Sequence, residues 1–447
     1  MDPTEAPPSF DVIRLVAGWV GRRAGGGARV LPTHVAALSE MSTENELDIK
    51  RYDRQIRLWG LDTQRGLQGA RILVLGVNGL SNEICKNLVL AGVGHLHIQD
   101  PGVLTADDLA LGGLFSVSAE RLGAPRAKVL AEELTSMNPS VNLVPEVKAV
   151  GAFTADFLRG FHFVVGTRGA DALHEVAACT ALTEAEPPKK RRRDTGTAGD
   201  GDRAATVGSN GTHEVVPERA SASAGAPRSP HYLAAGCLGL DGFCFFDLGG
   251  VSVKVTPAKK LSAGGDDAPA VEPPLPHTER ALYPTISAAS RVEWGALTPR
   301  VPRLYYALQL LMTASESKPS GADKETAAKL LPADMPLATA ELLPGLLARR
   351  AELLAAEAGG KGAKLVSDEY LAQLARTVGV ELAPVCAILG GIIGSEIIKI
   401  ISGKEKPINN AFFFDGATSD GICARLGPSF DCADGPNKGA FKRVEGE

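Results

Sequence analysis

Residues 74–83, VLGVNGLSNE, follow the apolar run RILVL and have the pattern of a turn between a parallel strand and a nucleotide-binding helix. Such a turn needs glycines where the backbone bends tightly and approaches phosphates, and a complete version here would read G-x-G-G-x-G. Only Gly76 and Gly79 remain, because Asn78 and Ser81 stand where two further glycines are expected. The pattern therefore predicts the strand–helix geometry, whereas its evidence for phosphate binding is weak.

A second group with possible chemistry is the arginine series in RYDRQIRLWG. Arg51, Arg54 and Arg57 recur every three residues, while Tyr52 and the apolar residues after it recur at helical spacing on another side. Ser42 or Thr43 can cap this helix at its start. The spacing alone leaves two interpretations open, a solvated basic face or a set of cations that contacts an anion.

A third basic group lies in the polar segment 185–229, which is rich in Gly, Ala, Ser, Thr, Pro and charge. Such a segment cannot bury enough apolar surface to offset chain entropy, so we expect it to be disordered. Two prolines precede its basic run, which has the pattern of a nuclear-import signal or of a solvated charge run. The run consists of Lys189, Lys190, Arg191, Arg192 and Arg193.

The composition limits the possible functions. The chain has 447 residues, 47 Lys plus Arg against 52 Asp plus Glu, and a net charge of -5, so no overall field favours nucleic acid or membrane, and we expect neither as a partner. The longest apolar stretch, 382–394, is shorter than the roughly 20 residues that span a bilayer. The seven cysteines show no C-x-x-C or Cys/His spacing for zinc, and we expect no metal site.

The elements that position these groups alternate between strand and helix. Apolar runs predict strands at 71–75, 95–99, 141–147 and 161–165, with helices at 80–91 and 123–137. This order predicts an α/β fold, a Rossmann-like, mostly parallel sheet covered by helices. Further strands are predicted at 231–236, 241–247 and 250–256, and a late strand pair around Asp415-Gly416 at an edge of the sheet.

The chain divides by composition into seven segments. We expect a disordered tail, or an extension ahead of a start at Met41, followed by two parts of the α/β domain around the basic insert, then a linker with a helical insertion, the closing helix and strands, and a flexible end. The segments are 1–45, 46–184, 185–229, 230–257, 258–378, 379–427 and 428–447.

Four stretches, in their order along the chain, carry a family resemblance: RYDRQIRLWG, VLGVNGLSNEICKNLVLAGVG, APVCAILGGIIGSEIIKIISG and NNAFFFDG. Together they resemble the small, non-catalytic subunits of SUMO-activating enzymes, in the ubiquitin-activating-enzyme-like (ThiF/MoeB-type) family. The resemblance implies a degenerate adenylation-domain fold. It covers roughly 46–180, 230–256 and 380–427, and it implies a larger catalytic subunit as partner.

The adenylating members of that family bind Mg-ATP and activate the carboxyl-terminal glycine of a ubiquitin-like protein. This sequence departs from their pattern at each ligand position. Asp100 is kept after the second predicted strand, but Gly102 stands where a second acid is expected. Arg126 replaces a lysine, and Arg168 falls about where the metal-binding Asp would lie. The resemblance therefore implies that this chain holds no cofactor and that Mg-ATP binds in the partner subunit.

One feature of the family survives. Its partner domains send a helix with a Y-x-R-Q segment across the dimer interface, and the arginine of that segment reaches the ATP phosphates of the active half. Tyr52-Asp53-Arg54-Gln55 resembles this segment, which implies that Arg54 acts in trans. The implied function is support of SUMO adenylation and of thioester formation on the partner's cysteine, and SUMO and its conjugating enzyme are reached through the complex. The basic run at 189–193 predicts a nuclear location with a cytoplasmic fraction.

Three alternatives remain open. The chain could be the equivalent subunit of a NEDD8-activating enzyme, although its length and the FFFDG ending favour SUMO. It could be a catalytically dead Rossmann scaffold that activates nothing. A nicotinamide-dependent dehydrogenase is the enzyme-class alternative, but it would need an intact G-x-G-x-x-G turn, which this sequence lacks.

Overall fold

A sheet of eight strands forms the centre of the molecule in this computed structural model, which describes residues 43–110, 117–185, 230–255, 276–297, 300–331, 337–356, 365–427 and 442–443. The strands lie in the order β10-β9-β6-β5-β4-β1-β2-β3. Their bounds are β1 (Arg71–Leu75), β2 (His95–Gln99), β3 (Asn142–Glu146), β4 (Phe163–Gly166), β5 (His231–Leu238), β6 (Asp241–Asp247), β9 (Ala411–Asp415) and β10 (Asp420–Ala424).

The sheet is parallel over β3, β2, β1, β4 and β5, and antiparallel from β5 through β6 and β9 to β10. The prediction of a Rossmann-like, mostly parallel α/β sheet is therefore confirmed. The late strand pair is confirmed as well, because β9 and β10 pair around Asp415 and β10 is the edge strand of this sheet.

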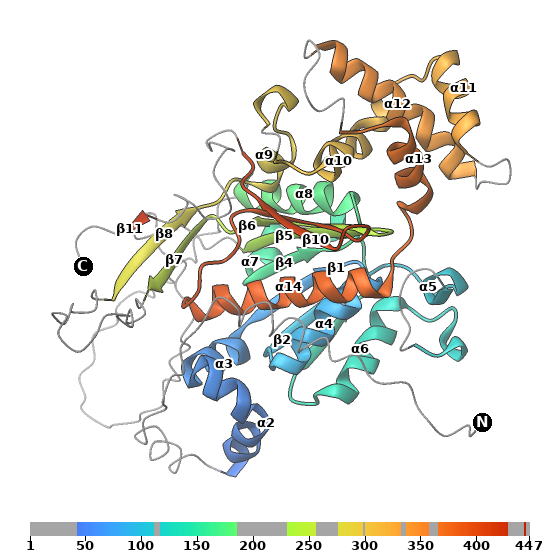
Figure 1. Cartoon of the computed structure of the whole chain (residues 1–447). Helices are drawn as coiled ribbons and strands as arrows, with labels where there is room; N and C mark the ends of the chain where they lie inside the picture. The colour runs from blue at the N-terminus through green and yellow to red at the C-terminus, as the bar shows by residue number, and fades with distance from the viewer. Residues whose placement is uncertain are drawn as a thin grey trace, which may run out of the picture.

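Helices cover both faces of the sheet (Figure 1). Those with buried residues on one face are α3, α4, α6 and α14, and those on the other include α7 to α10, α12 and α13. Their bounds, with the peripheral helices, are α2 (Thr43–Trp59), α3 (Leu61–Gly69), α4 (Gly79–Ala91), α5 (Ala106–Ala110), α6 (Arg126–Met137), α7 (Ala155–Arg159), α8 (Asp171–Ala185), α9 (Ile286–Ser290), α10 (Arg303–Thr313), α11 (Gly321–Leu330), α12 (Leu337–Ala356), α13 (Asp368–Thr377) and α14 (Ala383–Ser402).

The alternation of strand side chains explains why the sheet has two hydrophobic cores. In β1, Ile72 and Val74 belong to the cluster under α4 and α14, whereas Leu73 and Leu75 belong to the cluster on the opposite face. Successive strand residues point to opposite faces, so a continuously apolar run such as RILVL is buried on both sides. This burial places the end of β1, and with it the turn into α4, at the centre of the fold.

The closing helix α14 packs directly on α4. A Cβ atom at Gly390 would lie 2.7 Å from Cβ of Glu83, so the close approach of the two helices requires a glycine there. Gly403, with φ of 61°, ends the helix. By length and composition α14 could cross a membrane, although the apolar stretch 382–394 was expected to be too short to do so. Its inner side is buried in the core with a charged residue, Glu396, so its place is that of a core helix.

The strand β7 (Gly250–Val255) differs from expectation because it leaves the main sheet. It pairs with β8 (His277–Leu282), which in turn pairs with β11 (Lys442–Arg443), in a separate three-stranded sheet. The reason is that β6 already has neighbours on both edges, β5 and β9, so the next strand has no free edge to join. Gly249, with φ of 61°, lies in the turn between β6 and β7.

Other segment boundaries shift for local reasons. The strand β8 lies where a linker and helices were expected, because HTERAL has no apolar alternation that would reveal it. The strand β11 lies within the expected flexible end, and α2 begins at Thr43, inside the expected tail. The basic run 189–193 and nearly all of the insert 185–229 lie outside the described residues.

Candidate functional site

The turn between β1 and α4 keeps Gly76 for a contact within the chain. Gly76 has φ of 92°, which favours glycine, and its N–H donates to the carbonyl of Gln99 at 2.8 Å. A Cβ atom at this position would lie 2.7 Å from Cγ of Arg168. The side chain of Arg168 therefore occupies the space beside Gly76 that a phosphate would need.

Asn78 and Ser81 replace the other glycines of the turn with a capping box. The N–H of Ser81 donates to Oδ1 of Asn78 at 2.8 Å, and the N–H of Asn78 donates to Oγ of Ser81 at 2.8 Å. Nδ2 of Asn78 also donates to the carbonyl of Thr167 at 2.7 Å. These bonds satisfy the first turn of α4 and tie it to the end of β4.

A carboxylate from a distant part of the chain completes this closure. Oε2 of Glu381 accepts from the N–H of Gly79 at 2.6 Å and from that of Leu80 at 3.2 Å. Burial raises the pKa of Glu381 to about 7, although the two backbone hydrogen bonds act in the opposite direction. Glu381 could not be found from the sequence, because it lies about 300 positions from the turn with no motif around it.

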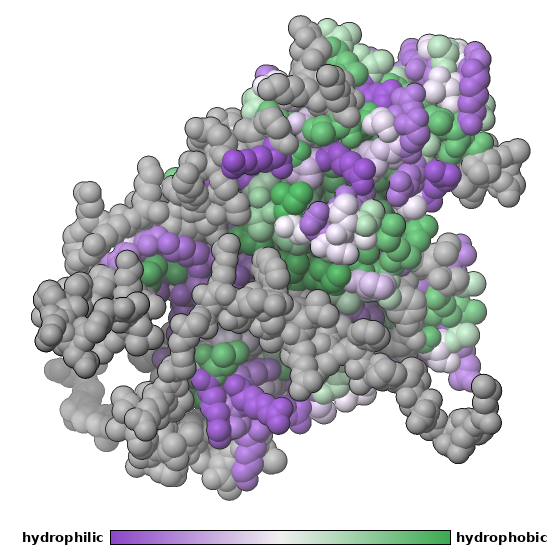
Figure 2. Space-filling view, in the orientation of Figure 1, coloured by the Kyte–Doolittle hydropathy of each residue, from purple (hydrophilic) through white to green (hydrophobic). Residues whose placement is uncertain are grey.

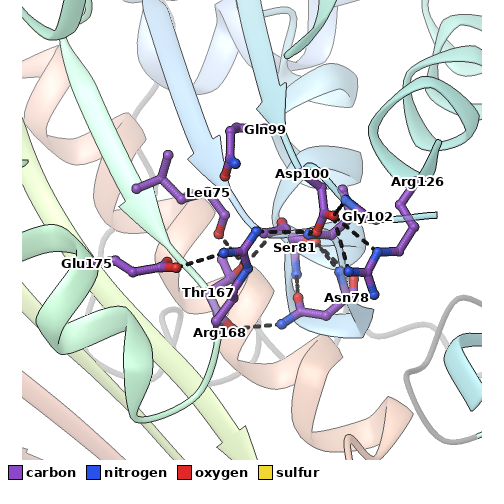
Figure 3. A network of polar contacts seen from close by, with 12 residues as sticks. Leu75, Asn78, Ser81, Gln99, Asp100, Gly102, Arg126, Thr167, Arg168 and Glu175 are labelled. Carbon is purple, nitrogen blue, oxygen red and sulfur yellow. Dashed lines mark hydrogen bonds and ion pairs between the residues drawn. The ribbon is translucent and has the colours of Figure 1, made fainter. Parts of the chain in front are cut away.

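Asp100, the single acid kept from the family pattern, is buried and fully used within the chain. Its carboxylate accepts from the N–H of Val77 at 2.9 Å and from that of Gly102 at 2.7 Å. It also forms ion pairs with Arg126 at 3.1 Å and with Arg168 at 3.5 Å. Figure 3 shows both guanidinium groups converging on Asp100 beside the turn.

Each arginine has a second carboxylate partner. Arg126 pairs with Asp108 at 2.9 Å, and Arg168 pairs with Glu175 at 2.7 Å. Partial burial opposes the charge of Arg126, but the charges of the two aspartates raise its pKa. Burial raises the pKa of Glu175, and the nearby Arg168 partly offsets this effect. Each arginine of the network thus lies between two carboxylates of the same chain, and neither Asp108 nor Glu175 was singled out from the sequence.

This arrangement does not fit a nucleoside triphosphate as it stands. The backbone donors at the start of α4 have partners within the chain, and Asp100, the acid next to the turn, is held by two arginines. Over the described ranges, no group of three or more His, Cys, Asp or Glu side chains is placed to hold a metal ion. A triphosphate site would need free donors together with carboxylate-held Mg²⁺.

The cysteines of the described residues are poor nucleophiles. Burial raises the pKa of the Cys179 thiol to about 12 and that of Cys423 to about 11. Cys432 lies outside the described residues. The other described cysteines, Cys85, Cys237, Cys244 and Cys386, are buried in apolar elements.

Arg54 lies on α2, away from the turn. The hydroxyl of Tyr52 accepts from Nδ2 of Asn138 at 2.7 Å, and Nε2 of Gln55 donates to the carbonyl of Leu90 at 3.2 Å. Asn138 follows α6 and also donates to the carbonyl of Val89 at 2.8 Å. These contacts therefore anchor α2 near the C-terminal ends of α4 and α6, about 16 Å along α4 from Gly79. Arg54 itself is exposed. The helix α2 lies at the lower end of the molecule (Figure 1), where the coloured surface is largely hydrophilic (Figure 2). The structure therefore does not bring Arg54 to this chain's own turn.

The strand order, the β1–α4 turn and the closed polar network define a Rossmann-like domain whose nucleotide turn is filled by its own side chains. Residues 52–432 match the ThiF family. The chain belongs to the ThiF family.

Two curated relatives show where in the family the similarity lies. SUMO-activating enzyme subunit 1 of Rattus norvegicus is 29% identical over 398 residues, which are 86% of this chain and 96% of that protein. SUMO-activating enzyme subunit 1B-1 of Arabidopsis thaliana is 28% identical over 385 residues, 86% of this chain and 97% of that protein. The crystal structure of E. coli MccB with succinimide aligns with a TM-score of 0.41 and 11% identity over 86% of this chain and 73% of that one, a similarity too low to support an inference. The resemblance stated from the sequence is confirmed.

Proposed function

We propose that this chain is the non-catalytic subunit of a heterodimeric SUMO-activating enzyme. Its relatives along most of its length carry the name SUMO-activating enzyme subunit 1. In this proposal the partner subunit holds Mg-ATP and the nucleophilic cysteine, and this chain holds no cofactor. The chain is thus part of an enzyme without being catalytic in isolation.

The main support for the proposal is a contrast between the turn that joins β1 to α4 and the exposed Arg54 on α2. The turn that a nucleotide would occupy is closed by Asn78, Ser81 and Glu381. Arg54, by contrast, is exposed on a helix that Tyr52 and Gln55 fix in place. A cation held on a rigid element can stabilise charge that develops in a site on another subunit, because its position needs no reorganisation.

In the proposed reaction, a carboxylate oxygen of the modifier's terminal glycine attacks the α-phosphate of ATP in the partner, and pyrophosphate leaves. The guanidinium of Arg54 stabilises the negative charge on the phosphates during this step. The partner's cysteine thiolate then attacks the acyl carbon and AMP leaves, which forms the thioester. The conjugating enzyme meets the modifier on the assembled complex.

The alternatives make different predictions for the assembled protein. A subunit of a NEDD8-activating enzyme would support thioester formation with NEDD8 and not with SUMO. A scaffold without activating function would support neither with any large subunit. For the dehydrogenase alternative, NAD would have to displace the residues that fill the turn, and tight NAD binding by the purified chain would favour it.

The proposed location is the nucleus, with some protein in the cytoplasm. The support is the run Lys189–Arg193 in the sequence, which has the composition of an import signal. In this proposal the basic run binds an import receptor, and no nucleic acid partner is proposed for it.

The test of the proposal is Arg54→Ala in the heterodimer reconstituted with the large subunit. Pyrophosphate exchange reports adenylation, and gel filtration reports assembly. We expect an intact complex with adenylation slowed on the order of 10 to 10³-fold, less than the 10³ to 10⁵ of arginines supplied in trans in phosphoryl transfer. Arg54→Lys should restore the rate only in part, because lysine lacks the planar fork.

Arg57→Ala is the matched control, because Arg57 is exposed on the same helix and pairs with Asp53 at 3.0 Å. It should leave exchange unchanged. An Arg54→Ala complex that assembles and adenylates at the parental rate contradicts the role in trans and returns Arg54 to a solvated charge. Failure of that variant to assemble would make its role structural.

A further inference from the structure

The backbone N–H groups at the start of α4 are all accounted for within the chain. The first turn of a helix leaves up to four such donors without helical partners. Here the N–H of Asn78 donates to Ser81, that of Ser81 donates to Asn78, and those of Gly79 and Leu80 both donate to Oε2 of Glu381. The next donor, the N–H of Asn82, reaches the carbonyl of Asn78 at 3.0 Å.

Two of these donors have the geometry that would suit an anion. A helix that follows a strand of a parallel sheet presents its N-terminal N–H groups and the positive end of its dipole to a phosphate. Gly79 and Leu80 are the residues that would present them here, and a single carboxylate oxygen receives both bonds. Chemically, the oxygen of Glu381 stands in for a phosphate oxygen.

Glu381 is held at this position by its own backbone. The N–H of Gly239 donates to the carbonyl of Val380 at 2.9 Å, and Glu381 forms a parallel bridge with Gly239. Two residues later α14 begins and packs along α4, with Gly390 against Glu83. The carboxylate therefore reaches the start of α4 from a segment that is fixed to the sheet and to the same helix.

We infer that Glu381 acts as a built-in plug of the turn between β1 and α4. Its side-chain oxygen occupies the backbone donors that a phosphate would need and keeps this turn closed to oligophosphates. The contact is autoinhibitory, because a carboxylate of the same chain occupies the N–H groups to which an external anion would bind. The segment that supplies it joins α13 to α14, so the plug also ties the end of the helical insertion to the nucleotide turn. This inference concerns the isolated chain and does not depend on the role of Arg54.

The test uses the full chain and inorganic pyrophosphate as the probe, at pH 8 and without added metal. Glu381→Ala removes the oxygen and leaves the N–H groups of Gly79 and Leu80 open. We expect this variant to unfold at a lower temperature than the wild type and to regain stability as pyrophosphate is added. Its affinity for pyrophosphate by calorimetry should exceed that of the wild type by about tenfold or more.

Two further variants separate the plug from general effects. Glu381→Gln keeps an acceptor oxygen for both donors, so it should remain stable and respond to pyrophosphate no more than the wild type. Glu325→Ala removes an exposed carboxylate of α11 that pairs with Lys329, and it should change neither stability nor pyrophosphate affinity at the turn.

Equal pyrophosphate affinity of the wild type and Glu381→Ala would overturn the inference, as would an equal response of Glu325→Ala. If Glu381→Ala is recovered only in low yield, its refolding gives the second measurement. A higher yield in pyrophosphate than in sodium chloride of the same ionic strength supports the plug, and equal yields overturn it. None of these outcomes bears on adenylation by the heterodimer, which the Arg54 variants measure.

Discussion

The replacement Glu381→Gln should make the protein more stable at pH 8 while leaving its stability near pH 4.5 unchanged. Glutamine has nearly the same shape, and its amide oxygen can accept the bonds from Gly79 and Leu80 that the carboxylate accepts now. The perturbation removes the charge and keeps the contact. The replacement therefore measures the free energy that it costs to hold an ionised carboxylate at the start of α4.

The magnitude follows from the pKa of Glu381. Burial is the main cause of its rise from 4.5 to about 7, and the two backbone hydrogen bonds oppose it. That difference corresponds to about 3 kcal/mol at 1.36 kcal/mol per pH unit. The side chain is not fully sealed from solvent, and the start of α4 favours negative charge, so we expect a measured gain of about 1–2 kcal/mol.

The pH window follows from the same two values. The folded state binds a proton at Glu381 more tightly than the unfolded state does, so the wild type loses stability as pH rises from 4.5 to about 7. Glutamine does not titrate. The difference in free energy of unfolding between variant and wild type should therefore be near zero below pH 4.5, grow up to about pH 7 and level off above it. The nearby Cys237 thiol, whose pKa is raised mainly by its hydrogen bond with Cys386, does not titrate in this window.

The assay is urea unfolding of both proteins at a series of pH values, with Glu325→Gln as the exposed control. A flat difference across the series would contradict this expectation, because it would mean that the protonation of Glu381 is not linked to folding. A wild type that is more stable than Glu381→Gln at pH 8 would also refute it. In that case the donors and dipole of α4 would outweigh burial, and the charged form would be the favoured one.

Further expectations concern the network and the insert. Gly76→Ala should lower the free energy of unfolding by about 1–3 kcal/mol in urea titrations, because alanine is strained at φ of 92° and its Cβ would displace Arg168. Asp100→Asn should cost about 2–4 kcal/mol in the same titrations, since it leaves two partly buried arginines without their shared charge. Replacement of Lys189–Arg193 by alanines should move the protein toward the cytoplasm in imaging of a fluorescent fusion, and an unchanged nuclear fraction would contradict the import signal. Deletion of 185–229 should leave the melting temperature nearly unchanged, since each doubling of loop length costs only about 0.6 kcal/mol.

The sheet could be predicted from the sequence wherever apolar runs are short, buried on both faces and bounded by turn residues. RILVL became β1 as expected, and DGFCFFD became β6 with its hairpin to β5. Prediction failed for β7, because sheet membership depends on which edges are free. That information lies in the pairing of β6 with β9, which joins segments about 170 residues apart.

The candidate site could be predicted only in part. The loss of the glycines at positions 78 and 81 was visible, and so was the presence of Asp100, Arg126 and Arg168 near the turn. Their mutual ion pairs were not visible, because the sequence shows which groups replace ligands but not whether those groups pair with one another. Glu381 gave no signal at all, since a single glutamate before an apolar helix has no motif, and its contact depends on how α14 packs on α4.

The closed turn also satisfies its own buried polar groups. The carboxyl ends of β1 and β2 and the start of α4 present polar groups that must find partners when they are buried. In this chain the capping box takes two donors, Glu381 takes two more, and Asp100 joins Val77 to Arg126 and Arg168. Glycines at positions 78 and 81 would remove only the capping box. The contacts of Glu381, the side chain of Arg168 over Gly76 and the ion pairs of Asp100 would remain, so restored glycines alone would not open the turn.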